Sequence, residues 1–197
     1  MKKLFAVLLI LLSIFLVGCG GDEPEAPPLY TPEILSKGTG FTVTLIRADD
    51  GSVKYGYTVT ASDGSEIESA VCAYQPKVAK LKEGRLIGIR FYTDNDTFCR
   101  YYDLKEGLAS QSYFGAFWDN GTLVGYNDFE RSGKLIVCDI FNSDGYRYEK
   151  EIQSNAMELI VTGTSVSEDG KTLSVKFKMG ESGYEQSAAM PLVKAEG

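Results

Sequence analysis

The chain is a succession of short apolar runs, each closed by a turn signal, and this pattern restricts its fold more than any other sequence feature. Phe41 to Arg47 alternates apolar and polar side chains, and Asp49-Asp50-Gly51 then turns the chain into Val53 to Thr60. Asx-Gly pairs between alternating runs are the strongest local signal for a β-hairpin. No long window shows the i, i+3, i+4, i+7 apolar spacing of a helix. The sequence therefore predicts an all-β fold, an antiparallel meander of short hairpin strands.

A weak internal repeat refines this prediction. Turns at Gly84, Gly121 and Gly170 each lead into an apolar run, and Asp50-Gly51-Ser52 is a candidate fourth copy. Recurrence of a unit every 20 to 50 residues or so marks propeller blades or similar arrays. The unit, with a later strand ending in Asp-Leu or Asp-Ile, resembles the blades of TolB-like β-propellers over about residues 80–192. The resemblance implies propeller-like repeats, with a β-sandwich and an open partial propeller as the alternatives.

Residues 1–18 have the features of a secretory signal peptide. Lys2 and Lys3 precede an apolar run from Leu4 to Val17, which is shorter than the roughly 20 residues of a bilayer span. The tetrad Leu16-Val17-Gly18-Cys19 resembles the lipobox of bacterial lipoproteins. The resemblance implies that a diacylglyceryl group joins the Cys19 thiol and that the signal peptide is removed before Cys19. A retained N-terminal anchor helix is the alternative.

The sequence divides the remainder into a tether and one domain. Residues 19–39 combine prolines with acidic side chains, so they cannot bury enough apolar surface to fold and are expected to form a flexible tether. Residues 40–197 have the length of a single domain. Removal of residues 1–18 takes away two lysines, which changes the formal charge from −7 to −9. Such an acidic domain is poorly suited to nucleic acid, which is bound through clustered Lys and Arg.

Several kinds of chemistry are excluded by what the sequence lacks. It contains no histidine, which excludes Ser-His-Asp catalysis and histidine-based zinc sites. No metal-ligand spacing and no phosphate-binding loop occur, so no metal or cofactor is expected. Of the cysteines after Cys19, Cys138 is expected to be buried beside Ile136 and Ile140. Cys72 and Cys99 are the preferred disulfide pair, with three reduced thiols as the alternative.

Aromatic residues gather in the middle of the domain and suggest a recognition surface. Tyr102, Tyr113, Trp118 and Tyr126 are its candidates, because such rings combine a large apolar face with a polar tip. The alternative is that these rings pack in the core, since strands favour aromatic residues. Asp103 and Asp139 occupy equivalent repeat positions, where capping of strand ends explains them better than catalysis does.

Together these features predict a non-enzymatic binding module, held at an extracytoplasmic membrane surface by the acyl chains on Cys19. That surface is the outer face of the cytoplasmic membrane, or the outer membrane if the host has one. The expected partner is an envelope protein or a wall component. The alternatives are a carboxylate-based hydrolase of wall polysaccharide or peptide and a substrate-capture module of a transporter.

Overall fold

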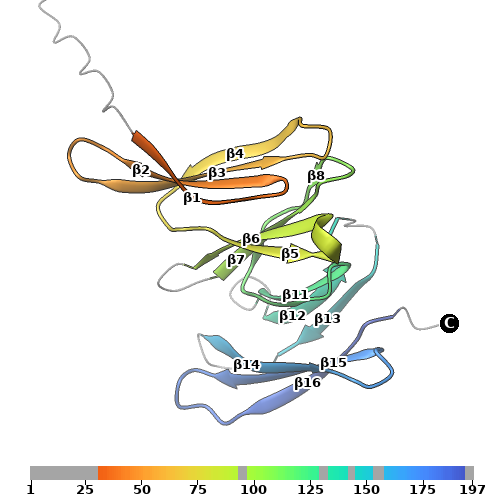
Figure 1. Cartoon of the computed structure of the whole chain (residues 1–197). Helices are drawn as coiled ribbons and strands as arrows, with labels where there is room; N and C mark the ends of the chain where they lie inside the picture. The colour runs from red at the N-terminus through yellow and green to blue at the C-terminus, as the bar shows by residue number, and fades with distance from the viewer. Residues whose placement is uncertain (1–30, 93–96, 129–132, 142–144, 153–157, 194–197) are drawn as a thin grey trace, which may run out of the picture.

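The computed structural model describes residues 31–92, 97–128, 133–141, 145–152 and 158–193 (Figure 1). Within these ranges the chain is almost entirely β, and its strands form four antiparallel sheets in an open arrangement with no closed barrel. The predicted all-β antiparallel meander is therefore confirmed, in its open form. No described helix is both long and apolar enough to cross a bilayer.

Each sheet takes consecutive strands in chain order. The first contains β1 (Thr31–Gly38), β2 (Phe41–Arg47), β3 (Val53–Thr60) and β4 (Glu66–Cys72). The second contains β5 (Lys77–Leu81), β6 (Leu86–Tyr92), β7 (Thr97–Asp103) and β8 (Leu108–Ala109), with β9 (Tyr113–Phe114) also paired to β7 and the short turn η1 (Lys82–Gly84) joining β5 to β6. The third contains β10 (Ala116–Asp119), β11 (Leu123–Asp128), β12 (Lys134–Asp139) and β13 (Arg147–Glu151). The fourth contains β14 (Leu159–Val166), β15 (Thr172–Met179) and β16 (Gln186–Pro191).

The sheets follow one another along a stack, and each neighbouring pair shares its own apolar core (Figure 1). Val43 and Val59 of the first sheet pack with Ile87 and Ile89 of the second. The second and third sheets share a core that includes Ile136, Cys138 and Ile140, which confirms the burial predicted for Cys138. Leu135 and Val137 alternate with those residues on β12 and therefore face the fourth sheet.

One backbone hydrogen bond occurs at the same place in all four sheets and shows that they repeat one unit. The residue at the end of the third strand, or just after it, donates its N–H to the carbonyl of the residue before the second strand. The third strand is β3 in the first sheet, β7 in the second, β12 in the third and β16 in the fourth. The pairs are Thr60 to Gly40 (2.9 Å), Leu104 to Arg85 (2.9 Å), Ile140 to Thr122 (3.0 Å) and Leu192 to Lys171 (2.7 Å).

This repeat places the fourth copy of the sequence unit differently from the prediction. Gly84, Gly121 and Gly170 lie in the turn between the first and second strands of their sheets, as Gly40 does in the first sheet. Gly51 lies in the next turn, between β2 and β3. The candidate copy at Asp50-Gly51-Ser52 is therefore wrong. The turn of the first sheet that is equivalent to the other three is the one at Gly40, one hairpin earlier. Both turns carry a glycine with positive φ, +73° at Gly40 and +82° at Gly51, so the local signal is the same.

The boundary predicted at residue 39 between tether and domain is also wrong. Strand β1 begins at Thr31 and pairs with β2, for example Glu33 with Leu45 and Gly38 with Phe41. Its described side chains are all at the surface or half-buried, so β1 has no apolar alternation and is held by its backbone ladder. The signal peptide, Cys19 and the tether up to residue 30 lie outside the described residues.

The two ends of the stack have mostly polar outer faces. By strand alternation, Thr42, Thr44 and Thr58 point away from the core of the first sheet, and Ser174 and Lys176 point away from that of the fourth. In arrays whose units contact only their neighbours, terminal units carry a polar outer face of this kind.

Candidate binding site

A cavity of about 270 Å³ opens at the turn edge of the second and third sheets. It is built from equivalent parts of the two repeats: the turns before β6 and β11 and the ends of β7 and β12. Its lining residues are Lys82, Arg85, Leu86, Asp103, Gly121, Thr122, Asp139, Ile140 and Phe141. Two cations, two carboxylates, a threonine hydroxyl and apolar side chains therefore meet at this place.

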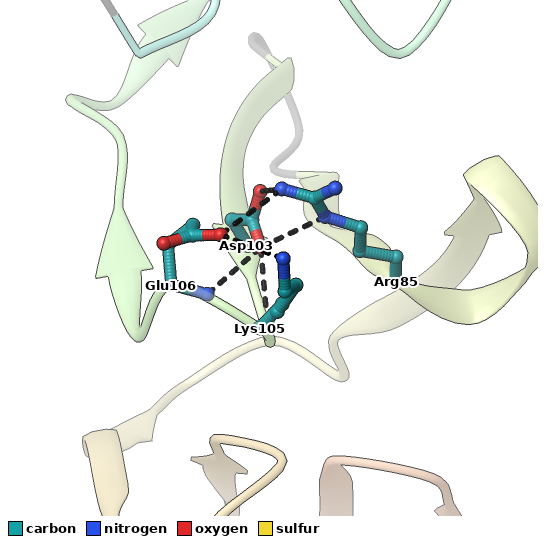
Figure 2. Close-up of polar contacts among 4 residues, drawn as sticks. All are labelled: Arg85, Asp103, Lys105 and Glu106. Carbon is teal, nitrogen blue, oxygen red and sulfur yellow. Dashed lines mark hydrogen bonds and ion pairs between the residues drawn. The ribbon is translucent and has the colours of Figure 1, made fainter.

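Asp103, at the end of β7, holds the following turn together (Figure 2). Its Oδ1 accepts the backbone N–H groups of Lys105 (3.0 Å) and Glu106 (3.1 Å). The Arg85 guanidinium reaches Oδ2 at 3.2 Å and also lies 3.4 Å from Glu106 Oε1. The carboxylate is thus used as a cap for the turn and as an anchor for Arg85.

These contacts decide the protonation state of Asp103. Partial burial alone would raise its pKa, but hydrogen bonds from the Glu106 amide, Arg85 and the Lys105 amide outweigh burial and lower the pKa below 3.8. A general acid needs the opposite shift. Asp139, its counterpart in the third sheet, accepts the Tyr146 N–H at 2.7 Å. The interpretation of both aspartates as caps of strand ends is therefore confirmed.

The cationic side of the cavity rests on an unusual turn. Lys82 and Glu83 have φ of +44° and +55°, in the left-handed region that side-chain-bearing residues rarely adopt. Such conformations persist only where the surroundings impose them. The Lys82 side chain lies over Gly121, where an added Cβ would be 3.2 Å from Lys82 Cγ. Among the described residues the Lys82 ammonium has no ion-pair partner, so its charge is available at the cavity.

A separate ionic network lies where the second and third sheets pack. Arg90 contacts Asp119 Oδ2 at 2.5 Å, and the Tyr101 hydroxyl donates to the same oxygen at 3.0 Å. The Asp119 side chain is only 6% exposed. Burial raises the pKa of Tyr101, so the phenol stays protonated and continues to donate. Asp119 Oδ2 thus joins the third sheet to two residues of the second.

The predicted recognition surface is divided by the structure. Tyr102 and Tyr113 are buried, so their assignment to a recognition surface is wrong. Tyr102 belongs to the core between the first and second sheets, and the Tyr113 hydroxyl donates to the Ile140 carbonyl at 2.5 Å. Trp118 and Tyr126 are half-buried: Trp118 packs against the core of the third and fourth sheets, and the Tyr126 hydroxyl accepts from Arg147 at 3.2 Å. The competing interpretation, that strand aromatics fill the core, explains the first two.

The preferred disulfide is not formed in the structure. Cys72, Cys99 and Cys138 are all free thiols. Cys72 packs against the core between the first and second sheets, whereas Cys99 belongs to the core between the second and third. The two thiols are therefore on different sides of the second sheet. Burial raises the pKa of each of the three thiols, which does not favour a nucleophilic thiolate.

The sequence did not identify Lys82 and Arg85 as site residues. Neither belongs to a motif, and single lysines and arginines in a turn are ordinary surface residues. The usable signal was the repeat: Arg85 and Thr122 occupy the same place before the second strand, and Asp103 and Asp139 the same place at the end of the third. Residues equivalent in adjacent repeats come together at one edge of a stack.

Comparison with known proteins gives little further information. No protein-family model and no curated protein matches the chain. An uncharacterised protein from Listeria monocytogenes EGD-e has a TM-score of 0.33 and 15% identity, over 82% of this chain and 53% of its own. A Bacteroides uniformis protein provisionally assigned as a 6-phosphogluconolactonase has a TM-score of 0.29 and 14% identity, over 79% of this chain and 56% of its own. The chain spans about half the length of both, and likenesses at this level support no conclusion about function.

Proposed function

We propose that this protein is an extracytoplasmic lipoprotein, anchored through Cys19, that binds a partner without catalysing a reaction. The observation that carries the binding role is the turn-edge cavity, in which Lys82 offers a charge that no described residue neutralises. The two carboxylates beside it are used as caps. The cavity thus offers a fixed cationic contact rather than an acid–base pair.

The open form of the cavity favours a macromolecular partner. Sites for whole small molecules are clefts or cavities of about 300 to 1,000 Å³ that bury most of the ligand, whereas this cavity, at about 270 Å³ near the lower limit, is open to the surface. It suits a single anionic group of a larger molecule, such as a carboxylate or phosphate on an envelope protein or wall polymer. This supports a binding module over a substrate-capture module.

Anchoring and binding are tested separately. For anchoring, we expect the wild-type protein to sediment with the membranes and to need detergent for its release. We expect a Cys19→Ala variant to stay in the supernatant. For binding, partners would be cross-linked in native membranes and identified by mass spectrometry, with wild type compared to Lys82→Gln. The matched control is Lys171→Gln, an exposed lysine at the equivalent turn of the fourth sheet.

The proposal expects a partner whose recovery falls at least tenfold with Lys82→Gln and is unchanged with Lys171→Gln. A partner set that is identical for all three proteins would refute the cavity as the binding site. Cleavage of purified wall polymer that disappears with Asp139→Asn would instead establish an enzyme.

A further inference from the structure

A second cavity lies on the other side of the turn that carries Lys82. It measures about 370 Å³, and its lining residues are Thr39, Lys80, Glu83 and Gly84. Because Thr39 belongs to the turn between β1 and β2, this cavity lies between the first and second sheets, as the first cavity lies between the second and third. Each cavity is lined by two residues of the turn 82–85. The two cavities are therefore neighbours along the turn edge of the stack.

The two cavities offer the same kinds of polar group. Each is lined by a lysine, a carboxylate outside any ion pair and a threonine: Lys80, Glu83 and Thr39 in the second cavity, and Lys82, Asp139 and Thr122 in the first. Like Lys82, Lys80 has no ion-pair partner in the part of the chain that the structure describes. The two lysines are two residues apart, so their Cα atoms are separated by no more than about 7 Å. A ligand made of similar units can therefore occupy both cavities at once.

The mixture of donors and acceptors favours sugar units. A hydroxyl group both donates and accepts hydrogen bonds, so it can pair with an ammonium and a carboxylate in one cavity. A polyphosphate only accepts, and its charges would be repelled by Glu83 and Asp139. The first cavity also contains the Phe141 ring, 38% exposed. Such a ring provides a large apolar face, on which the C–H face of a sugar can pack.

The charges of the two cavities differ in one respect. In the second cavity the charges of Lys80 and Glu83 balance, which suits the hydroxyl groups of a neutral sugar. In the first cavity Arg85 is paired with Asp103, and Asp139 caps the backbone N–H of Tyr146. Lys82 is left to bind a charge of the ligand.

We propose that the two cavities bind adjacent units of a polysaccharide, with a neutral sugar at Lys80 and a sugar carboxylate at Lys82. The assignment rests on the proposed function and names the chemical class of its partner. Lys80 thereby becomes a binding residue, and Lys82 becomes the residue that distinguishes an acidic sugar from a neutral one.

The test uses the full chain in detergent and labelled hexasaccharides that alternate a uronic acid with a neutral sugar, from hyaluronan, chondroitin and heparosan. Each is compared with its carboxyl-reduced counterpart and with a linear polyphosphate, and binding is measured by fluorescence anisotropy. We expect at least one acidic hexasaccharide to bind, and its carboxyl-reduced form to bind at least tenfold more weakly, because a charge-assisted hydrogen bond is lost. We expect polyphosphate to bind more weakly than the acidic hexasaccharide.

Three variants separate the two cavities. Lys82→Gln should bring the affinities for the acidic and reduced forms within twofold of each other. Lys80→Ala should weaken both forms at least fivefold and leave their ratio unchanged. Lys77→Ala is the matched control, since Lys77 is an exposed lysine at the other end of β5, and it should bind both forms as wild type does.

Four results would overturn the proposal. They are a panel in which no hexasaccharide binds, equal binding of acidic and reduced forms to wild type, a Lys82→Gln variant that keeps the preference for the acidic form, and a Lys80→Ala variant that binds as wild type. If no hexasaccharide binds but Lys82→Gln still loses a cross-linked protein partner, the polysaccharide is refuted and the proposed function stands. If the cross-linked partners are also identical, both are refuted.

Discussion

Replacement of Gly40 by alanine tests how the first and second sheets are locked together. Gly40 has φ of +73°, and an added Cβ would overlap Leu104 Cδ1 and lie 3.0 Å from the Thr60 carbonyl oxygen. Leu104 is buried in the core shared by the two sheets, and its own carbonyl accepts the Ser62 N–H at 2.7 Å. The glycine is therefore required both by its backbone conformation and by the side chain above it.

The magnitude follows from these two requirements. A left-handed conformation costs a residue with a Cβ about 1–2 kcal/mol, and overpacking in a well-packed core costs about 1–3 kcal/mol. We expect Gly40→Ala to lower the free energy of unfolding by about 2–5 kcal/mol. Gly84→Ala is the matched control: it has φ of +83° at the equivalent turn but nothing within 4 Å of the added Cβ. It should cost only about 1–2 kcal/mol.

A double-mutant cycle separates the two contributions. Leu104→Ala alone should cost about 2–5 kcal/mol by emptying its site. In the double variant the added Cβ no longer meets Leu104, so the overpacking cost disappears and the two changes are less than additive by about 1–3 kcal/mol. Urea unfolding can be followed by the fluorescence of Trp118, the sole tryptophan. Additivity within about 0.5 kcal/mol would refute the lock between Gly40 and Leu104.

Three further predictions follow from the polar contacts and the thiols. Because the pKa of Asp103 is lowered in the folded protein, its ionised form stabilises the fold above the unfolded pKa, and this contribution is lost as pH falls through the folded pKa. Asp103→Asn should therefore lower the free energy of unfolding by about 1–2 kcal/mol at pH 7. Urea titrations at a series of pH values should show that this difference from wild type disappears well below pH 3.8. Arg90→Met leaves the buried Asp119 carboxylate with the Tyr101 hydroxyl as its remaining side-chain partner among the described residues and should cost about 3–5 kcal/mol. An unchanged urea midpoint would mean that the ion pair contributes nothing. A thiol count on the denatured protein without reductant should find all three thiols that follow Cys19. In the native protein the half-buried Cys72 should react first with a thiol reagent. A denatured count of one thiol would mean that two of the cysteines form a disulfide after all.

The local sequence pattern predicts the fold class, but it does not predict which turn is the equivalent one in each repeat. Alternation and Asx-Gly turns are properties of single hairpins, and they identify strands wherever one face is buried. They do not say which hairpin begins a sheet. Gly40 and Gly51 both have positive φ, so only the tertiary position of β1 distinguishes them. None of the described side chains of that strand is buried, and Pro32 and Glu33 continue the proline and acid pattern of the segment before it, which predicts a tether.

The aromatic residues show a second limit of the sequence. Alternation places Tyr101 and Tyr102 on opposite faces of β7, and in a sheet covered on both sides both faces are core. Adjacent aromatic residues are then buried together. A sequence pattern cannot tell such a strand from one whose second face is exposed, because the covering sheet comes from elsewhere in the chain. The sequence alone therefore leaves Tyr102 as a candidate for the surface, although it is buried.

The same reasoning explains why the proposed binding cavity lies at an edge. The second and third sheets are covered on both faces, so their strands have no free face for recognition. At the turn edge, equivalent residues of these adjacent repeats converge around Lys82. In a stack held together by nearest-neighbour contacts, residues of this edge can change by substitution without disturbing the cores between sheets. Binding at the edges is therefore the function that such an arrangement can acquire at the least cost in stability.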